Sequence, residues 1–459
     1  MTRPNIVFFL VDDMGCGDIG CYGNTFHETP AIDQLCNEGV KFTQAYSACT
    51  VCSPSRAALL TGRYPARLHL TDWIAGHEKP YGKLKVPDWN MRVDHERITL
   101  PKALKKAGYE THFIGKWHLM PHLEPEIMND YLPEKQGFDT NTGGREWGQP
   151  KGPGKYFHPF GMPDVEGEEG DYLTDILTDK AVGIINSKPE KPFLLYLSYY
   201  ILHGPLMTKE SYKEKYKQKA ADSGLDYHDR HFNYAGMVQS MDESVDRVLT
   251  ALKENGLDEN TIIVYTADNG GVHNYSNGGL REGKGHAYEG GTRVCQMIKY
   301  PKVVTPGSQY SYPVIHNDLY PTLLEMAGLP AESEEHLDGV SLAKSIKENS
   351  SISRNDLYWH YPHYHNTLPY SAVRSGGMKL IEFLEDGKHE LYDLKNDPAE
   401  KTNLAKDKPE TTASLLKNLN NWRKMVGAQM MESNPNYDPD RENEGSRRPK
   451  PKGPEFLTE

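Results

Sequence analysis

Two apolar segments, far apart in the chain, each run directly into a pair of oxygen-bearing side chains. The first, residues 6–11, ends at Asp12 and Asp13, and the second, residues 261–267, ends at an aspartate followed by an asparagine. Short runs of continuous apolar residues are typical of strands buried on both faces of a parallel sheet. Because open α/β sheets bind ligands beyond the carboxyl ends of their strands, both polar pairs lie where a binding site is expected.

Strand-like and helix-like segments alternate along much of the chain. The helix-like segments begin with Thr or Pro or end before Gly, which are common start and stop signals of helices. The expected helices cover residues 29–39, 99–107, 172–186 and 233–255, and further strands are expected at 111–114 and 193–199. This alternation predicts an α/β fold in which a large, mostly parallel sheet is flanked by helices.

The composition and the hydrophobic pattern of the sequence change in two places. Residues 119–171 are rich in Gly and Pro and show little periodicity, which indicates a long insertion that lines a pocket more than it builds core. From about Arg354, short aromatic runs predict antiparallel strands. We therefore expect a main domain over 1–353 and a smaller C-terminal α+β subdomain over 354–459, in which the polar, Pro-rich residues 432–456 form a tail or a surface wrap.

Composition excludes several classes of partner. The 459 residues include 52 Lys and Arg against 64 Asp and Glu, a net charge of −12, whereas a generic nucleic-acid binder needs an excess of basic residues. No apolar run approaches the roughly 20 residues of a membrane-spanning helix, so no span is expected. The N-terminus shows no signal-peptide pattern, which predicts a cytoplasmic protein, or a periplasmic or secreted one if a signal peptide was trimmed.

The six cysteines are too sparse for a disulfide framework. Cys49 and Cys52 form a C-x-x-C pair, but no second such pair exists, and this disfavours a zinc or redox site. For the cysteines other than Cys52 we expect buried, inert thiols.

The most specific motif of the chain begins at Cys52. Residues 52–63 read CSPSRAALLTGR, and residues 108–118 read GYETHFIGKWH. These segments resemble, in the right order, the two signatures of the type I formylglycine-dependent sulfatases of the alkaline-phosphatase-like superfamily. The resemblance, which is to bacterial carbohydrate sulfatases, extends from Asn5 to about Ala327. It implies the fold of that superfamily, and a maturation enzyme that oxidises Cys52 to formylglycine.

The chemistry of sulfate monoesters agrees with such a nucleophile. Cleavage of the S–O bond needs a strong nucleophile, cations on the sulfuryl oxygens and a proton donor for the leaving oxygen. Hydrated formylglycine is a geminal diol: one hydroxyl attacks sulfur, and the other, once deprotonated, expels sulfate. An ordinary Ser or Cys has no second hydroxyl. The competing interpretation of Cys52 is an unmodified buried thiol.

The polar pairs at the two strand ends form a set of oxygen ligands. Three carboxylates and an amide suit Ca²⁺ or Mg²⁺ and disfavour zinc, although either pair alone would fit a solvated turn or a helix cap better than a metal site. The resemblance implies Ca²⁺, bound together with the formylglycine oxygen at position 52. The predicted metal ligands are Asp12, Asp13, Cys52, Asp268 and Asn269.

The two signatures also supply an arginine, a lysine and a histidine. Arg56 lies one helical turn beyond Cys52, so both side chains can face one site. The resemblance implies that Arg56 stabilises the formylglycine and that Lys116 holds the sulfate. It makes His118 the base that deprotonates the diol.

Two more candidates lie farther along the chain. His203 follows the strand at 193–199 in a segment similar to the H-x-P of the family, which implies contact with the bridging oxygen and proton donation to the leaving group. Lys284 lies in residues 277–294, which resemble a K-G-x-x-x-E-G-G-x-R-V segment whose lysine bridges sulfate and leaving oxygen. Cys295 stands where proline usually follows, and this departure puts the local backbone in doubt but not the lysine.

Candidate substrate-binding residues lie in loop-like, aromatic surroundings. Such side chains can stack on sugar rings and bond hydroxyls, although a packed subdomain would give the same pattern. We expect an O-sulfated carbohydrate substrate, of glycosaminoglycan or galactan type and including galactose-configured sugars. The candidates are Arg145, His360, His363 and His365.

Three other functions stay open on the sequence alone. They are an arylsulfatase of broad specificity, a phosphonate or phosphate monoester hydrolase of the same superfamily, and a sulfated-glycan-binding protein in which Cys52 is not matured. The complete set of catalytic residue types disfavours the last of these. The sequence does not indicate the sugar, the position of the sulfate, exo or endo action, or the oligomeric state.

Overall fold

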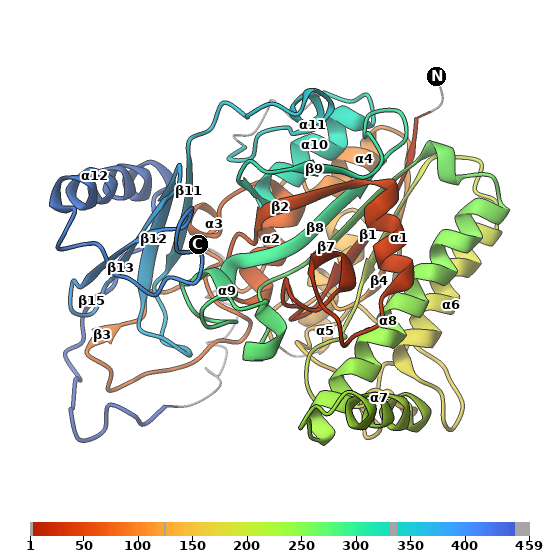
Figure 1. Cartoon of the computed structure of the whole chain (residues 1–459), viewed down its shortest axis with the longest axis horizontal. Helices are drawn as coiled ribbons and strands as arrows, with labels where there is room; N and C mark the ends of the chain where they lie inside the picture. Colours follow the sequence, from red (N-terminus) through yellow and green to blue (C-terminus); the bar gives the residue numbers. More distant parts are fainter. Residues whose placement is uncertain (1–2, 124, 331–336, 446–459) are drawn as a thin grey trace.

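The computed structural model describes residues 3–123, 125–330 and 337–445, and a nine-stranded sheet forms its centre (Figure 1). The strands of this sheet are β1 (Asn5–Val11), β2 (Val40–Tyr46), β4 (Glu110–Gly115), β5 (Thr140–Thr142), β6 (Phe193–Ser198), β7 (Thr261–Ala267), β8 (Arg293–Lys299), β9 (Ser308–Tyr310) and β10 (Val314–Ile315). Their order is β10–β2–β8–β7–β1–β6–β4–β5, with β9 beside β2. Neighbouring strands are parallel except that β8 runs against β2 and β7.

The central strands β1, β6 and β7 are buried along their whole length. Their sequences are almost continuously apolar, which is the pattern of strands covered on both faces. The register pairs Val11 with Ala267 at the carboxyl ends of β1 and β7. The polar pairs that follow these two strands therefore emerge side by side.

Helices cover both faces of the sheet. On one face α8 contacts both α1 and α6, and on the other α2 contacts both α4 and α10 (Figure 1). Helix α1 begins at Pro30 and α4 follows the N-cap Thr99, as the start signals predict. The helices are α1 (Pro30–Glu38), α2 (Cys52–Thr61), α3 (Pro65–Leu68), α4 (Leu100–Lys106), α5 (Pro125–Met128), α6 (Leu173–Asn186), α7 (Glu210–Asp222), α8 (Asp229–Glu254), α9 (Glu289–Thr292), α10 (Leu319–Met326), α11 (Ala343–Glu348) and α12 (Pro409–Val426).

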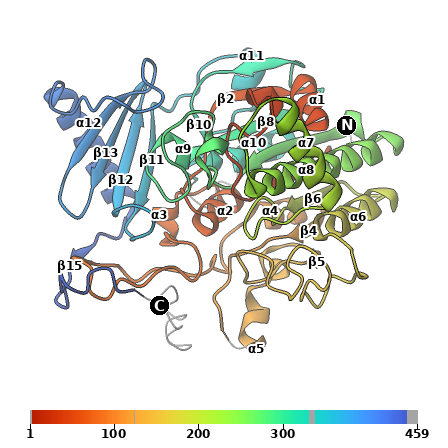
Figure 2. The same cartoon turned by 60° about the horizontal axis from the view of Figure 1, so that its bottom comes forward.

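A second, antiparallel sheet lies beside the first (Figures 1 and 2). It contains β11 (Asp356–Tyr361), β12 (Tyr370–Ser375), β13 (Met378–Phe383) and β14 (His389–Asp393), in that order. Helix α12 packs on β12 and β13. The two sheets confirm the predicted fold class, while the domain boundary between residues 353 and 354 stays a prediction.

The segment 119–171 does more than line a pocket. Its strand β5 extends the main sheet beside β4, and Phe138, Tyr156 and Phe160 belong to the hydrophobic core. The expectation of a pocket-lining insertion with little core was therefore wrong in part, because aromatic residues scattered among Gly and Pro leave no periodic signal.

The start of helix α8 differs from the predicted residue, and part of the predicted C-terminal tail can be compared with the structure. Helix α8 begins at Asp229 instead of 233. The short strands β3 (Leu84–Lys85) and β15 (Glu432–Ser433) pair with each other, so the polar C-terminal segment wraps the surface as far as residue 445. Residues 446–456 of the predicted tail lie outside the described residues.

The cysteines and helices bear on two further expectations. All six cysteines are free. Cys16 and Cys21 are only half-buried, although we expected buried thiols. None of the helices in the described part of the chain combines the length and apolar character of a membrane-spanning segment.

Candidate active site

Cys52 is the first residue of α2, a helix whose ten residues are all buried. Val51 before it is extended, so the chain turns into the helix at the cysteine itself. The side chain is 1% exposed, and burial raises the pKa of its thiol to about 12. The unmodified thiol is thus a poor nucleophile, because thiolate is the reactive form.

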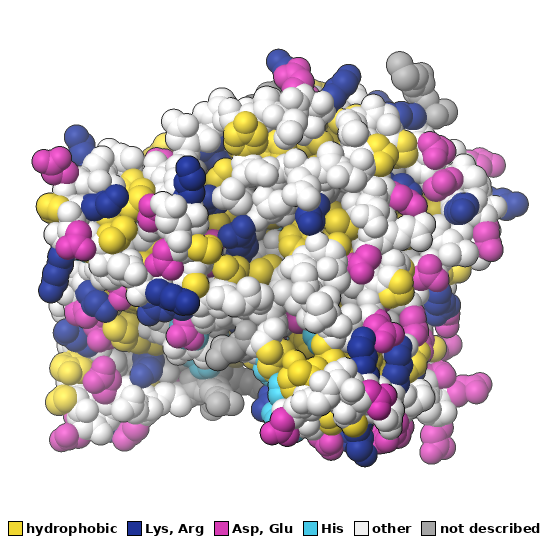
Figure 3. All heavy atoms as spheres, in the orientation of Figure 1, with side chains coloured by type: hydrophobic (Ala, Val, Ile, Leu, Met, Phe, Trp, Pro, Cys, Tyr) yellow, Lys and Arg dark blue, Asp and Glu magenta, His cyan; other side chains and the backbone are white. Residues whose placement is uncertain are grey.

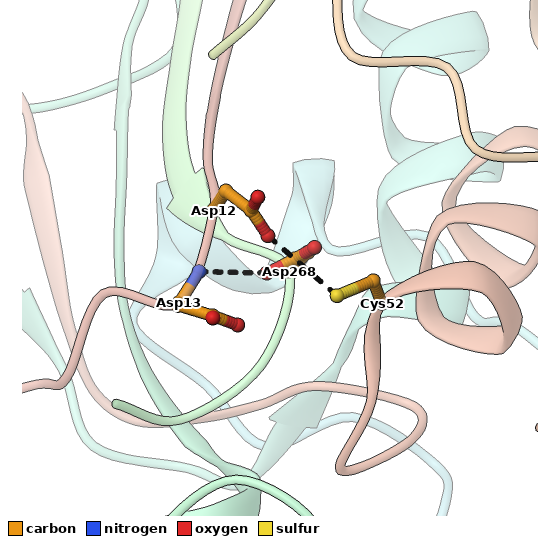
Figure 4. Close-up of side chains that lie close together, drawn as sticks. All are labelled: Asp12, Asp13, Cys52 and Asp268. Atoms are coloured by element: carbon orange, nitrogen blue, oxygen red, sulfur yellow. Dashed lines mark hydrogen bonds between the residues drawn. The ribbon is translucent and has the colours of Figure 1, made fainter. Parts of the chain in front are cut away.

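The ends of β1 and β7 bring the predicted acidic residues to this thiol (Figure 4). The Asp13 backbone N–H donates to Asp268 Oδ1 at 3.1 Å, and Cys52 Sγ lies 3.6 Å from Asp12 Oδ1. One ligand atom from each of Asp12, Asp13, Cys52 and Asp268 lies within 4.8 Å of the others. The structure therefore brings together residues from three separate parts of the chain.

Two buried cations neutralise part of this acidic cluster. Arg56 donates from Nε to Asp268 Oδ2 at 2.8 Å, and Lys116 Nζ lies 2.7 Å from Asp12 Oδ2. Burial acts to raise the pKa of Asp268, but Arg56 and Lys116 outweigh it and hold that pKa below its ordinary value. For Asp12, burial prevails over Lys116 and raises the pKa to about 8. The positive charges of the protein therefore do not fully compensate a negative charge on the Asp12 carboxylate.

A third cation, Lys284, joins the acidic cluster to the thiol. Its Nζ lies 2.6 Å from Asp13 Oδ1 and 3.2 Å from Cys52 Sγ. Burial would raise the pKa of Asp13, but Lys284 and His203 overcome this and hold the pKa well below its usual range. Lys284 is thus placed where the reacting group of a substrate would meet position 52.

His203 and His118 present imidazoles to the same region. His203 Nε2 lies 3.6 Å from Asp13 Oδ2, and burial lowers the pKa of this histidine to about 4. His118 Nε2 bonds the Ile74 carbonyl oxygen. Because a carbonyl only accepts, Nε2 carries the proton and Nδ1 is the basic nitrogen. Burial, followed by Lys116, lowers the pKa of His118 well below its ordinary value.

The donor set of the cluster fits a hard divalent cation. Asn269 donates from Nδ2 to Asp13 Oδ1 at 2.9 Å, while its Oδ1 is buried without a hydrogen-bond partner among the described residues. Together with the carboxylates, this oxygen completes a group of ligands of the kind that Ca²⁺ and Mg²⁺ prefer. An unpaired buried oxygen costs stability unless something binds it.

A cavity of about 450 Å³ opens above Cys52. Its described lining contains lysines, histidines, a tryptophan and amides but no Asp or Glu. The lining residues are Cys52, Trp73, Ile74, Ala75, His77, His118, His122, Gly148, Gln149, Lys151, His203, Lys284, His365 and Asn366. We refer to it as the catalytic cavity.

Of the four predicted substrate-binding residues, only His365 belongs to this described lining. Arg145 pairs with Asp164 at 3.0 Å, and its carbonyl oxygen accepts the His118 backbone N–H. Its side chain therefore supports the insertion, and direct contact with substrate stays a prediction that this geometry does not favour.

His360 and His363 point into the protein. His360 lies on β11, not on a loop, and its ring nitrogens contact Ser371 Oγ and the Gln429 carbonyl oxygen, both at 2.8 Å. His363 Nε2 contacts Thr71 Oγ1 at 2.8 Å, and its side chain is 1% exposed. This geometry favours packing, the competing interpretation, and direct contact of these two histidines with substrate stays a prediction.

Most residues of the cavity wall were not predicted individually from the sequence. Trp73 and His77 lie in the segment after α3, and Gln149 and Lys151 lie in the long insertion. The segment of Trp73 and His77 has no periodicity or recognisable motif, so only the folded structure places it at the site. The insertion that holds Gln149 and Lys151 was expected to line a pocket, but neither residue was singled out.

Comparison with known proteins identifies the family of this chain. The sulfatase family model matches residues 4–329, and the model of the C-terminal region of N-sulphoglucosamine sulphohydrolase matches residues 283–425. The chain belongs to the sulfatase family. The alkaline-phosphatase-like fold expected from the two signatures is thereby confirmed, and this sulfatase is a sulfuric ester hydrolase.

Several relatives match nearly the whole chain. A sulfatase of Formosa agariphila is 32% identical, with 91% of this chain and 88% of the relative covered. Human arylsulfatase A is 30% identical, with 87% and 83% covered. The crystal structure of Ps i-CgsB in complex with k-i-k-neocarrahexaose has a TM-score of 0.76 and 29% identity, and covers 92% of this chain and 93% of that one.

Proposed function

We propose that this sulfatase hydrolyses an O-sulfated carbohydrate, with formylglycine derived from Cys52 as nucleophile and Ca²⁺ held by the acidic cluster. The observation that carries the proposal is the position of Cys52, at the start of a buried helix and at the floor of the catalytic cavity. Its Sγ lies 3.6 Å from Asp12 Oδ1 and 3.2 Å from Lys284 Nζ. A formylglycine-generating enzyme would have to act on this cysteine before the chain folds around it, since it is 1% exposed.

Formylglycine and Ca²⁺ would supply complementary chemistry. When formed, formylglycine supplies a nucleophilic hydroxyl and a second hydroxyl from which sulfate can be released. When bound, Ca²⁺ supplies a positive charge that polarises a sulfuryl oxygen. The residues that would hold the ion are Asp12, Asp13, Asp268 and Asn269 together with position 52.

The chain's own side chains then orient the substrate and move protons. Lys284, whose Nζ lies 3.2 Å from Cys52 Sγ, would hold both the sulfate and the leaving oxygen. His118 has its Nε2–H engaged by the Ile74 carbonyl, which leaves Nδ1 to accept the proton of the second hydroxyl, from which sulfate is released. His203 presents Nε2 near Asp13, and donation to the leaving oxygen requires this nitrogen to be protonated.

The wall of the catalytic cavity supports a sugar as the leaving group. The Trp73 indole belongs to this wall, and the rings of His77 and His365 lie 5.0 Å apart. Gln149 and Asn366 add amides that can bond hydroxyls. An aromatic face beside several polar groups suits a hydroxylated ring better than a wholly apolar one. The oligosaccharide bound to the similar protein Ps i-CgsB supports the same class of substrate.

Purified, matured enzyme should be screened against defined O-sulfated mono- and disaccharides and an activated aryl sulfate. We expect kcat/KM for at least one sulfated sugar to exceed that for the aryl sulfate, because contacts with the sugar can lower the barrier at sulfur. A higher value for the aryl sulfate than for every sugar would reject the carbohydrate while leaving the sulfatase activity intact.

A further inference from the structure

A second and larger cavity lies between the two sheets. We call it the intersheet cavity; its volume is about 820 Å³, and its described lining shares no residue with the catalytic cavity. In the orientation of Figure 1, Lys and Arg side chains (dark blue in Figure 3) gather in the hollow between β11 and β2. The lining residues are Thr43, Gln44, Arg293, Tyr312, Pro313, Ser351, Ile352, Arg354, Asn355, Leu357, Arg374, Ser375, Gly376, Gly377, Leu394, Lys395 and Pro398.

The charge of this lining is one-sided. It contains three arginines and a lysine, while no Asp or Glu occurs among its described residues. Asp318 neutralises the charge of Arg354, because Arg354 NH2 lies 2.7 Å from Asp318 Oδ2. The other cations of the lining are Arg293, Arg374 and Lys395.

Arg293 shares its carboxylate with another cation. Its NH1 lies 3.4 Å from Glu289 Oε2, and Lys379 Nζ lies 3.0 Å from Glu289 Oε1. Lys379 also lies 3.1 Å from Glu400 Oε1. Glu289 also interacts electrostatically with the remaining arginine of the lining. Two carboxylates therefore face three cations, and one positive charge exceeds the negative charges.

Arg374 is that remaining arginine. Its side chain donates to the Tyr46 hydroxyl at 2.7 Å and to the Gln44 side-chain oxygen. The Tyr46 hydroxyl in turn donates to Glu289 Oε2 at 2.7 Å. The residue is 4% exposed, and its buried Nε has no hydrogen-bond partner among the residues described. Arg374 makes no direct ion pair among the described residues, and the Tyr46 hydroxyl separates it from Glu289, so its charge adds to the positive potential of the cavity. Lys395, which is exposed, adds a second charge at the rim.

We infer that the intersheet cavity is a second binding site, for a tetrahedral oxyanion of the sulfate type. Guanidinium groups bind such anions through charge-assisted hydrogen bonds, and Ser351, Ser375 and Asn355 add neutral donors to the same wall. The volume falls in the range of sites for small organic ligands, so the anion can be free or carried on a saccharide. This inference rests on the cavity alone and not on the proposed nucleophile or substrate.

Crystals of the matured enzyme, grown without sulfate and soaked in a selenate series, test the site directly. The anomalous signal of selenium gives the occupancy of each cavity separately, and the catalytic cavity serves as an internal control. We expect selenate beside Arg374 with saturable occupancy. Selenate that fills only the catalytic cavity would overturn the inference.

Variants of the lining supply a second measurement. Arg374→Met and Lys395→Glu should each raise the selenate concentration for half-occupancy of the intersheet cavity by about tenfold or more, as expected for loss of a charge-assisted bond. Because Arg374 is buried, Lys395→Glu provides the test if the first variant does not fold. The matched control is Lys406→Glu, an exposed lysine of the same subdomain outside the lining. Equal half-occupancy in Lys395→Glu and Lys406→Glu would contradict the assignment.

Kinetics distinguish the two sources of the anion. If the anion is carried on a glycan, Lys395→Glu should raise KM for a long sulfated polysaccharide and leave KM for an aryl sulfate unchanged. If it is free sulfate, both KM values should stay unchanged while selenate occupancy falls. A rise in both KM values without any change in occupancy would show an effect on the catalytic cavity, and would reject the second site.

Discussion

Two buried thiols near each other in the sequence have very different surroundings. Cys52 Sγ contacts Asp12 and Lys284, whereas Cys49 belongs to a hydrophobic cluster with Ala58 and Tyr64. Cys52→Ala should lower kcat by at least about 10³-fold because it removes the nucleophile. Its thermal stability should stay close to wild type.

The matched control for this variant is Cys49→Ala. It should keep most of the turnover and lower the free energy of unfolding by about 1 kcal/mol, as for a small truncation in a core. Measurements of kcat on an aryl sulfate and of denaturant midpoints check both variants. Turnover of Cys52→Ala comparable to that of Cys49→Ala would reject position 52 as the nucleophile.

Two histidines of one segment should separate substrate binding from packing. His365 lines the catalytic cavity, so His365→Ala should lower kcat/KM for a sulfated sugar by about tenfold more than for an activated aryl sulfate. His363 is buried against Thr71, so His363→Ala should lower the melting temperature and affect both substrates alike. Equal losses on the two substrates for His365→Ala would remove the reason for placing the sugar at His365.

The sequence predicts the centre of the site better than its wall. Asp12 and Asp268 could be placed together because each follows a recognisable apolar strand, and the carboxyl ends of parallel strands share one edge. Cys52, Lys116 and Lys284 required the family signatures, since their spacing alone does not bring them together. The wall residues come from irregular segments, whose course depends on tertiary packing.

At the scale of elements, α1 shows how one helix can stabilise the start of another. Thr29, the expected N-cap, makes no capping bond to α1. Instead Asp242, which is buried on α8, accepts from the Ala31 and Ile32 backbone N–H groups at 3.2 and 2.9 Å. The free N–H groups of a helix start need such partners, and here the partner comes from 210 residues away along the chain.

Asp242→Ala should therefore lower the free energy of unfolding by about 1 to 2 kcal/mol, the range for loss of an N-cap. Asp246→Ala, an exposed change on the same helix, should alter it by less than about 0.5 kcal/mol. Urea unfolding of the two variants checks this comparison. Similar values for both would show that the bonds from Asp242 contribute little.

The elements that the sequence did not reveal lack a clear pattern of burial. Helix α7 buries only Tyr216 and Ala220, so it has no apolar stripe of the kind that predicts a helix. Strands β2 and β8 mix polar and apolar residues, and β8 runs against its neighbours, which a simple alternation of strand and helix does not suggest. The long helices and strands with a regular hydrophobic pattern were predictable, because burial requires apolar residues at their buried positions.

At the scale of the whole molecule, the acidic cluster joins β1, β7 and α2. Three carboxylates gather there within one buried region, so a bound cation should stabilise the native state by mass action. Chelation should lower both activity and melting temperature, and Ca²⁺ should restore both better than Zn²⁺, because the side-chain ligands are mostly oxygens.

The melting temperature makes this test independent of turnover. Removal of metal that leaves the melting temperature unchanged would argue against an ion in the cluster. Recovery with Zn²⁺ alone would show that the ligands have been assigned to the wrong metal.

The most direct test of the account is the mass of the peptide that contains Cys52, taken from enzyme with measured sulfatase activity. The account predicts a peptide whose mass has decreased by the replacement of CH₂–SH with an aldehyde, in a fraction that rises in proportion to specific activity across preparations. Fully active enzyme in which this peptide carries only an unmodified cysteine would contradict the central claim.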